Sequence, residues 1–272
     1  MHDVVIVGGG IIGGSIAFEL AQRNLHVAVL DRQELMREAS WAAAGMLSPA
    51  PDCPAAIPIV PLGRASLALY PKFIDAVEDA SGQRTGYRTG GAVEVIFRGE
   101  AERELSTLVA LHHGLGLACE ALPLEEARNM EPLLGRDARA AALLPDECSI
   151  EPRALASATL AAAASAGAAL CPGVDVISLA HEGKKCVGVK TSSGEIFHAA
   201  QVVHILVGPH NEQIGVRKVT RGFGERLAVA VLVEQLRHLL ASDLLFEQRA
   251  QDNGRRSGVF QLPRRVDLVA QR

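Results

Sequence analysis

The stretch at residues 3–20, DVVIVGGGIIGGSIAFEL, constrains the fold more than any other part of the chain. DVVIVG is a short and continuously apolar run, which is typical of a strand buried in a parallel sheet. The residues after the glycines carry apolar side chains at helical spacing. LHVAVLDR then predicts a second strand that ends at Asp31. The order of strand, glycine turn, helix and strand predicts a Rossmann-like α/β domain that binds a dinucleotide.

Each conspicuous residue of this unit has a physical role. Gly8 permits the tight turn, Gly10 lets the backbone approach a pyrophosphate, and Gly13 lets the helix pack closely on the strand. The helix N-terminus offers N–H groups to the phosphates. Asp31 can accept hydrogen bonds from a ribose, and its charge disfavours the 2′-phosphate of NADP. The motif alone does not separate NAD from FAD.

The residues after Asp31, RQELMREASWAAAGMLSPAP, depart from a nicotinamide-binding domain. Such a domain would continue through a helix to a third strand, whereas this chain runs into small residues at 42–45 and then prolines. Small side chains let backbone N–H groups lie against a flat or phosphorylated ligand. The alternative interpretation of the same residues is an alanine-rich helix in the core.

The two motifs together resemble the D-amino-acid-oxidase-like flavoproteins, especially bacterial glycine oxidase of the thiamine pathway. The motifs are VVIVGGGIIGG and EASWAAAGMLSP. The resemblance continues through residues 87–97, 149–170 and 174–203, so it covers about the first 203 residues. It implies an α/β fold in which a Rossmann-like FAD-binding domain carries an inserted α+β substrate domain on an antiparallel sheet.

The resemblance implies FAD as the cofactor and identifies the residues that contact it. Glutamate often stands where this chain has Asp31, and the departure preserves the hydrogen-bond acceptor. Trp41 packs beside the cofactor or has a plain packing role. The implied FAD contacts run from the pyrophosphate turn through the ribose and the middle of the cofactor to the flavin and the adenine: Gly8, Gly10, Ile11, Ile12 and Gly13; Asp31 and Arg32; Ala39 and Ser40; Ala44, Gly45 and Met46; and Val176.

The resemblance also predicts how the chain divides into domains. Residues 1–85 form the first part of the FAD-binding domain, and residues 86–148 form part of the substrate domain. Residues 149–207 return to the FAD-binding domain through an alanine-rich helix that begins at Pro152. Residues 208–272 form a divergent tail.

The tail is where the resemblance ends. The family typically has VVxAxGxWS, and this chain has QVVHILVGPHN. Residues 208–272 hold eleven basic and seven acidic residues, a net charge of +4, which leaves a net charge of −8 in residues 1–207. We expect either a frameshift or truncation near residue 204, which leaves the fold incomplete, or a diverged member with a helical cap. The sequence therefore assigns no catalytic residue, and neither Arg221 nor Arg226 is promoted to bind a substrate carboxylate.

Composition excludes several classes of function. A net charge of −4 argues against a general nucleic-acid binder, and no apolar run is long enough to span a membrane. The sequence has no signal-peptide pattern ahead of Asp3. Its five cysteines are scattered without a CxxC pair, which favours the cytoplasm and no metal site. A homo-oligomer is compatible with the sequence.

His112 and His113 are adjacent near the end of a predicted helix. Adjacent residues do not share a helix face, and no carboxylate is spaced to orient either ring. We interpret the pair as a solvated helix end.

The resemblance implies oxidative deamination of glycine or another small (D-)amino acid or secondary amine by oxygen, which yields an α-keto acid, ammonia and hydrogen peroxide. The flavin carries out the redox chemistry, so the lack of an evident nucleophile or acid–base pair does not argue against an enzyme. The alternatives are another amine flavoenzyme, of sarcosine oxidase or D-amino-acid dehydrogenase type, and an inactive fragment of an FAD-binding domain.

Overall fold

The computed structural model describes residues 1–51, 53–183, 185–207 and 214–218. Most of the predicted tail, residues 208–272, therefore lies outside the described residues. The chain divides into two compact units. The first consists of Met1–Ala43, Ala76–Arg84 and the residues from Pro152 on, and the second of Ala44–Asp75 and Thr85–Glu151.

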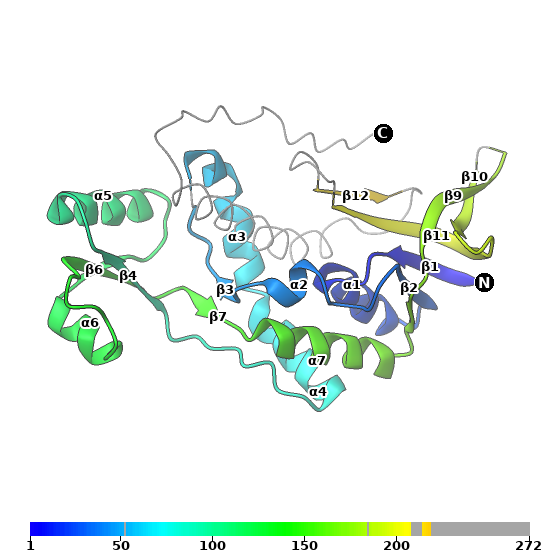
Figure 1. Cartoon of the computed structure of the whole chain (residues 1–272), viewed down its shortest axis with the longest axis horizontal. Coiled ribbons are helices and arrows are strands. Elements are labelled where there is room, and N and C mark those ends of the chain that lie inside the picture. The colour runs from blue at the N-terminus through cyan, green and yellow to red at the C-terminus, as the bar shows by residue number, and fades with distance from the viewer. Residues whose placement is uncertain (52, 184, 208–213, 219–272) are drawn as a thin grey trace. The chain divides into compact units, whose positions relative to one another are not determined.

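The first unit is built on a sheet that is seven-stranded within the described residues. Its centre is parallel, in the order β8-β2-β1-β11, and an antiparallel pair continues it as β10-β9. The seventh strand, β12, pairs antiparallel with β11 (Figure 1). The strands are β1 (His2–Val7), β2 (Val27–Asp31), β8 (Ala169–Pro172), β9 (Val176–Glu182), β10 (Lys185–Thr191), β11 (Ile196–Val207) and β12 (Ile214–Lys218).

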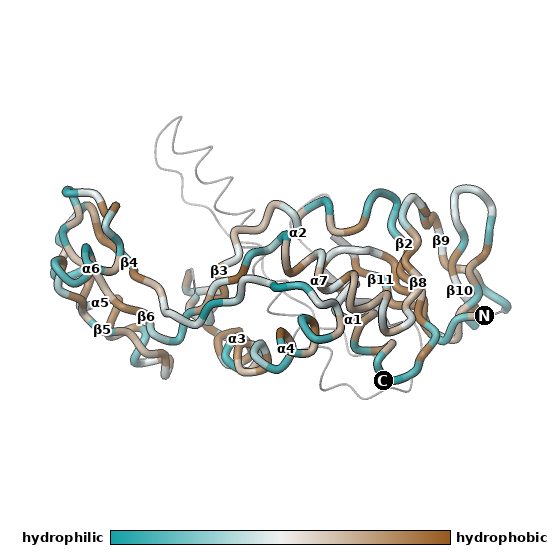
Figure 2. The backbone as a smooth tube through the Cα atoms, turned by 90° about the horizontal axis from the view of Figure 1, so that it is seen from below, coloured by the Kyte–Doolittle hydropathy of each residue, from teal (hydrophilic) through white to brown (hydrophobic). Residues whose placement is uncertain are grey.

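The two inner parallel strands, β1 and β2, contain consecutive buried hydrophobic residues, which is typical of strands covered on both faces. Hydrophobic residues lie along β2, β8 and β11 (Figure 2). Val5, Leu30, Val189 and Val202 are each at most 1% exposed and belong to one core cluster.

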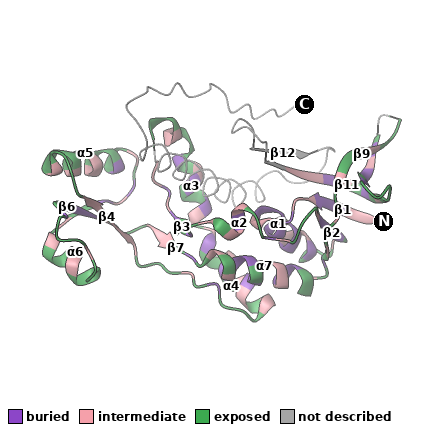
Figure 3. Cartoon of the chain, viewed as in Figure 1, coloured by how far each residue is buried: buried purple, intermediate pink, exposed green. Residues whose placement is uncertain are grey.

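Two helices of the first unit pack against each other. These are α1 (Ile11–Ala21), which links β1 to β2, and the alanine-rich α7 (Pro152–Ser165). Figure 3 shows that α1 is buried along most of its length. Gly14 lies where the helices meet, because a Cβ there would be 3.4 Å from Thr159 Cγ2. Small side chains along α7 let α1 come this close.

The second unit contains a small antiparallel sheet in the order β4-β6-β5 and a two-stranded ribbon, β3 with β7. Helix α5 packs on this sheet, with its main contacts to β6. The elements of this unit are β3 (Met46–Leu47), η1 (Pro54–Ile59), α3 (Val60–Leu67), β4 (Ala92–Ile96), α5 (Ala101–Gly114), β5 (Glu120–Leu122), α6 (Leu124–Met130), β6 (Ala140–Leu144) and β7 (Cys148–Ser149). Two further helices are α2 (Ala39–Ala42), in the first unit, and α4 (Tyr70–Ser81), whose residues fall in both.

The fold confirms the predicted α/β class, with a Rossmann-like parallel sheet and a separate unit on an antiparallel sheet. The units change at Ala43/Ala44, Asp75/Ala76, Arg84/Thr85 and Glu151/Pro152. Residues 44–75, which we expected in the first unit, cluster with the second. Labelling the units as FAD-binding and substrate domains stays a prediction.

The prediction that His112 lies solvated at the end of a helix was wrong. This side chain is only 4% exposed, because the last turn of α5 turns it towards the interior of the second unit. His113 is exposed as expected.

Across the part of the chain that the structure describes, no helix is both long and apolar enough to cross a membrane. In the same residues, no group of three or more His, Cys, Asp or Glu side chains is arranged to hold a metal ion.

Truncating a core side chain tests how much the parallel sheet contributes to stability. Leu30 is fully buried in β2, whereas Leu133 is 97% exposed. We expect Leu30→Ala to lower the free energy of unfolding by about 2–5 kcal/mol, because it removes apolar contacts and leaves a cavity. Leu133→Ala should change it by less than about 0.5 kcal/mol. Urea denaturation followed by circular dichroism measures both, and equal effects would contradict the assignment of the core.

Candidate functional site

The turn between β1 and α1 leaves no room for side chains. Gly8 has a φ of +110°, which favours glycine, and its N–H donates to the Leu30 carbonyl at 2.9 Å. A Cβ on Gly13 would lie 2.0 Å from the Gly8 carbonyl oxygen. Helix α1 therefore meets the end of β1 at backbone contact distance, and glycine is required for this approach.

The first helical turn of α1 presents backbone N–H groups next to the glycine turn. The helical ladder opens with Gly14 N–H donating to the Gly10 carbonyl at 2.9 Å. The Ile11 N–H donates instead to Ser40 Oγ, also at 2.9 Å. The N–H groups of Ile12 and Gly13 have no acceptor within the helix, as at every helix start. These donors and the positive end of the helix dipole favour an anionic ligand.

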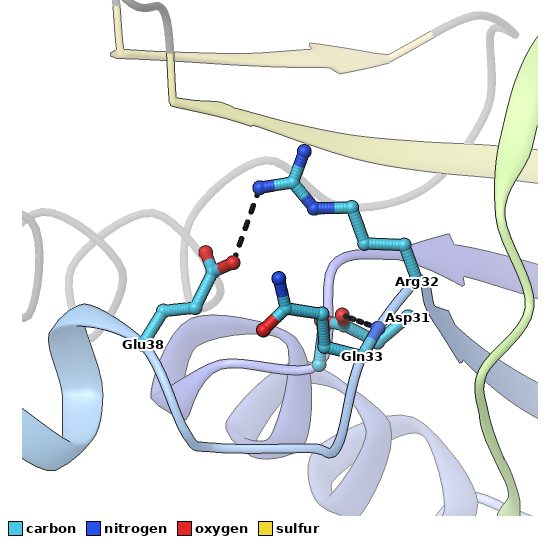
Figure 4. Close-up of polar contacts among 5 residues, drawn as sticks. Asp31, Arg32, Gln33 and Glu38 are labelled. Carbon is cyan, nitrogen blue, oxygen red and sulfur yellow. Dashed lines mark hydrogen bonds and ion pairs between the residues drawn. The ribbon is translucent and has the colours of Figure 1, made fainter.

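Asp31 fastens the glycine turn to the end of β2. Its Oδ2 accepts the Gly9 N–H at 2.7 Å. Its Oδ1 accepts the Gln33 N–H at 3.0 Å (Figure 4). A carboxylate has about four acceptor positions, so two bonds leave capacity for hydroxyl groups. The arrangement suits the ribose contact predicted for this residue.

Arg32 is held by an ion pair beside this carboxylate. Its Nη2 lies 3.1 Å from Oε1 of Glu38, and both side chains are more than half exposed (Figure 4). The hydrogen bond and charge of Glu38 raise the pKa of the Arg32 guanidinium. An exposed pair of this kind contributes little to stability, so the role of Arg32 at a ribose stays a prediction.

Helix α2 carries Ser40 to the N-terminus of α1 and is anchored through Trp41. The guanidinium of Arg37 lies 4.5 Å from the centre of the indole ring, and that of Arg153, from α7, lies 4.9 Å from it. Arg153 Nε also donates to the Trp41 carbonyl at 3.5 Å. These two cation–π contacts hold α2, and therefore help to hold Ser40 Oγ on the Ile11 N–H.

Val176 begins β9 near the end of β2. The Val174 N–H donates to the Asp31 carbonyl at 2.7 Å, and the Gly173 N–H donates to the Gln33 carbonyl at 3.2 Å. The segment that leads into β9 therefore runs beside the predicted ribose contact. Val176 itself is partly buried against the core cluster.

The three residues predicted near the flavin, Ala44, Gly45 and Met46, belong to the second unit. Gly45 has a φ of +85°, and its carbonyl accepts the Ile150 N–H at 2.8 Å. Met46 pairs with Ser149 across the β3–β7 ribbon and remains 54% exposed. The structure thus gathers the other ten predicted residues in the first unit.

Sequence reasoning missed three residues that build this site. Gly9 is bound at both backbone groups: its N–H reaches Asp31, and its carbonyl accepts the Met36 N–H at 2.8 Å. Met36 has a φ of +61° and is 3% exposed, a strained conformation for a side chain of this size. Glu38 holds Arg32. Of these, only Gly9 had a signal in the sequence, as the middle residue of the GGG run.

Comparison with known proteins agrees with this geometry. The profile of the DAO family, described as FAD dependent oxidoreductase, matches residues 3–267. The chain belongs to this family. The cofactor of this family is FAD. The family match therefore decides between NAD and FAD, which the glycine motif alone left open. The family match runs to residue 267, whereas the resemblance of individual sequence motifs to the family ends at about residue 203.

Similar proteins include several glycine oxidases. Glycine oxidase of Geobacillus kaustophilus is 34% identical over 217 residues, which is 79% of this chain and 57% of that protein. The bifunctional protein ThiO/ThiG of Trichormus variabilis is 34% identical over 197 residues, 72% of this chain and 29% of that protein. The crystal structure of glycine oxidase from Bacillus cereus superposes with a TM-score of 0.68 at 29% identity, covering 75% of this chain and 55% of that one.

The chain thus spans little more than half the length of the glycine oxidases that it matches.

The residues present fit the FAD of this family. The two N–H groups at the start of α1 suit a pyrophosphate, and the turn of Gly8 to Gly10 has no side chain to obstruct it. Gly8, Gly10 and Ile11 are partly exposed, whereas Gly9 is buried. Ile12 and Gly13 are buried, so they can offer a ligand their backbone N–H groups and not their side of the helix, and their contact with FAD stays a prediction.

Placing a methyl group at Gly13 tests the cradle. We expect Gly13→Ala to weaken FAD binding by roughly tenfold or more, equivalent to about 1.4 kcal/mol, because the new Cβ would push α1 away from the Gly8 carbonyl. The matched control is Gly90→Ala, where a Cβ would meet nothing within 4 Å. Flavin fluorescence titration measures both variants, and unchanged binding in Gly13→Ala would contradict the geometry.

Removing one hydroxyl tests the contact between α2 and α1. Ser40→Ala should lower the free energy of unfolding by about 0.5–2 kcal/mol, because the Ile11 N–H loses its acceptor. The control is Ser81→Ala, which removes an exposed hydroxyl that accepts the Gln83 N–H. It should change stability by less than about 0.5 kcal/mol. Equal losses by urea denaturation would argue that Ser40 has no special role.

Proposed function

We propose that this protein carries out the FAD-dependent oxidative deamination of glycine or another small amino acid or secondary amine. The observation that carries the proposal is the 34% identity to a glycine oxidase over 217 residues. The glycine turn, Asp31 and the AAAGM segment carry the same resemblance in the sequence. The substrate class of the relative is transferred to this chain only as part of the proposal.

The first unit holds the cofactor in this proposal. The N–H groups of Ile12 and Gly13 bind the pyrophosphate, and the helix dipole of α1 stabilises its charge. Asp31 accepts hydrogen bonds from the ribose hydroxyls. Its two bonds to backbone N–H groups orient the carboxylate before the ribose binds. Val176 lies beside the adenine. Ser40 fixes the start of α1 against movement when the ligand binds.

The proposed flavin contacts lie in the segment around Gly45. We assign Ala44, Gly45 and Met46 to contacts with the ring, and Gly45 has a φ of +85° in this segment. The Ile150 N–H fixes the peptide after Gly45 by hydrogen bonding to its carbonyl. The exposed Met46 side chain supplies an apolar surface for a flat ligand.

FAD supplies the acceptor for the two electrons that leave the amine, and the protein supplies orientation and electrostatics. The overall reaction balances as amino acid, oxygen and water giving α-keto acid, ammonia and hydrogen peroxide. With glycine the keto acid is glyoxylate. Among the described residues we assign none to the substrate carboxylate, so the proposal assigns cofactor contacts only.

The absorption spectrum of the purified chain tests the proposal. We expect a yellow protein whose flavin band bleaches when glycine is added without oxygen and returns when air is admitted, with formation of hydrogen peroxide. The Gly13→Ala variant is the control for bound flavin. Bleaching by sarcosine or D-alanine in place of glycine would move the substrate to another amine. Reoxidation only by an artificial acceptor would indicate a dehydrogenase.

A flavin band that no amine bleaches would leave cofactor binding without the proposed reaction. A colourless protein would contradict both the proposed FAD binding and the proposed reaction.

A further inference from the structure

His112 carries a buried nitrogen that no group in the described part of the chain satisfies. Its Nδ1 lies 3.0 Å from the Leu108 carbonyl oxygen, one helical turn earlier in α5. A carbonyl only accepts, so the proton of the neutral ring is on Nδ1, and Nε2 keeps a lone pair. Nε2 is buried and has no hydrogen-bond partner among the residues that the structure describes. The neighbouring His113 differs, because its Nε2 lies 2.9 Å from the Cys119 carbonyl oxygen.

His112 lines a small cavity in the second unit. The cavity offers about 10 Å³ to the centre of a water-sized molecule, which is about the space that one water needs. Its walls come from three segments: residues 49–50 after β3, residues 112–118 at the end of α5, and residues 144–147 between β6 and β7. Since Nδ1 is engaged with the helix, Nε2 is the ring nitrogen available to this cavity.

The polar side chains around the cavity only accept hydrogen bonds. They are the lone pair of His112 and the carboxylates of Asp146 and Glu147. Asp146 Oδ2 already accepts the Ala118 N–H at 3.3 Å, and Glu147 Oε1 accepts the hydroxyl of Ser48. A ligand of the size of one water that donates hydrogen bonds suits these acceptors.

We propose that this cavity is a binding site for one structural water molecule. The water donates one hydrogen to His112 Nε2 and the other to a carboxylate oxygen of Glu147 or Asp146. Buried waters typically make about three hydrogen bonds to polar groups that would otherwise be unsatisfied. Through this water, the end of α5 is joined to the β6–β7 connection. The inference concerns the second unit and does not depend on the proposed reaction.

Crystals of the full chain, soaked in rubidium chloride, test the proposal directly. We expect one ordered density peak within hydrogen-bonding distance of His112 Nε2 and of one carboxylate oxygen, without anomalous signal at the rubidium edge. An anomalous peak at this position would mean that the site binds a monovalent cation, such as ammonium or potassium, and would overturn the assignment to water. A cavity without density would also overturn it.

Two variants identify the ligating nitrogen. His112→Asn keeps a donor near the position of Nδ1 and removes Nε2, so the water peak should be lost or strongly weakened. His113→Gln keeps a group that can reach the Cys119 carbonyl and should leave the peak unchanged. A peak that persists in His112→Asn would show that Nε2 is not a ligand.

The histidine tautomer gives a test in solution that needs no variant to fold. Long-range nitrogen–proton NMR spectra of the full chain should show His112 with its proton on Nδ1 and with Nε2 as an acceptor. A protonated Nε2 would contradict the proposed hydrogen bond from the water.

Discussion

The first unit depends on the close approach of α1 to β1 at Gly13 and Gly8. A Cβ placed on Gly13 would lie only 2.0 Å from the Gly8 carbonyl oxygen, so no side chain fits at this point. The approach places the start of α1 at the carboxyl end of the parallel strands, where α/β sheets bind their ligands. Asp31 and Ser40 then hold the turn from two directions, through the N–H groups of Gly9 and Ile11.

These contacts show a division of labour within the candidate site. The groups offered to the pyrophosphate belong to the backbone, whose position the packing of α1 on β1 and α7 determines. The side chains around them fix that backbone: Asp31 holds the turn, Ser40 holds the helix start, and the indole of Trp41 holds α2. Substitutions of these side chains should therefore affect cofactor binding partly through stability.

How far the sequence predicts the site depends on the kind of interaction. The GxGxxG spacing, the first two strands and Asp31 were predictable because each follows from local pattern and steric need. The bond between Met36 and Gly9 and the burial of His112 were not, because both arise where distant segments pack. Residues 44–75 likewise joined the second unit through contacts with residues 85–151 that no local pattern encodes.

Titration of the cofactor-free chain with FAD, followed by the quenching of flavin fluorescence, tests the central claim most directly. The account predicts saturation at one FAD per chain and competition by ADP, which carries the same ribose and phosphate groups that Asp31 and the start of α1 would bind. A flavin that stays free, or that binds without competition from ADP, would contradict the assignment of the glycine turn as the cofactor site.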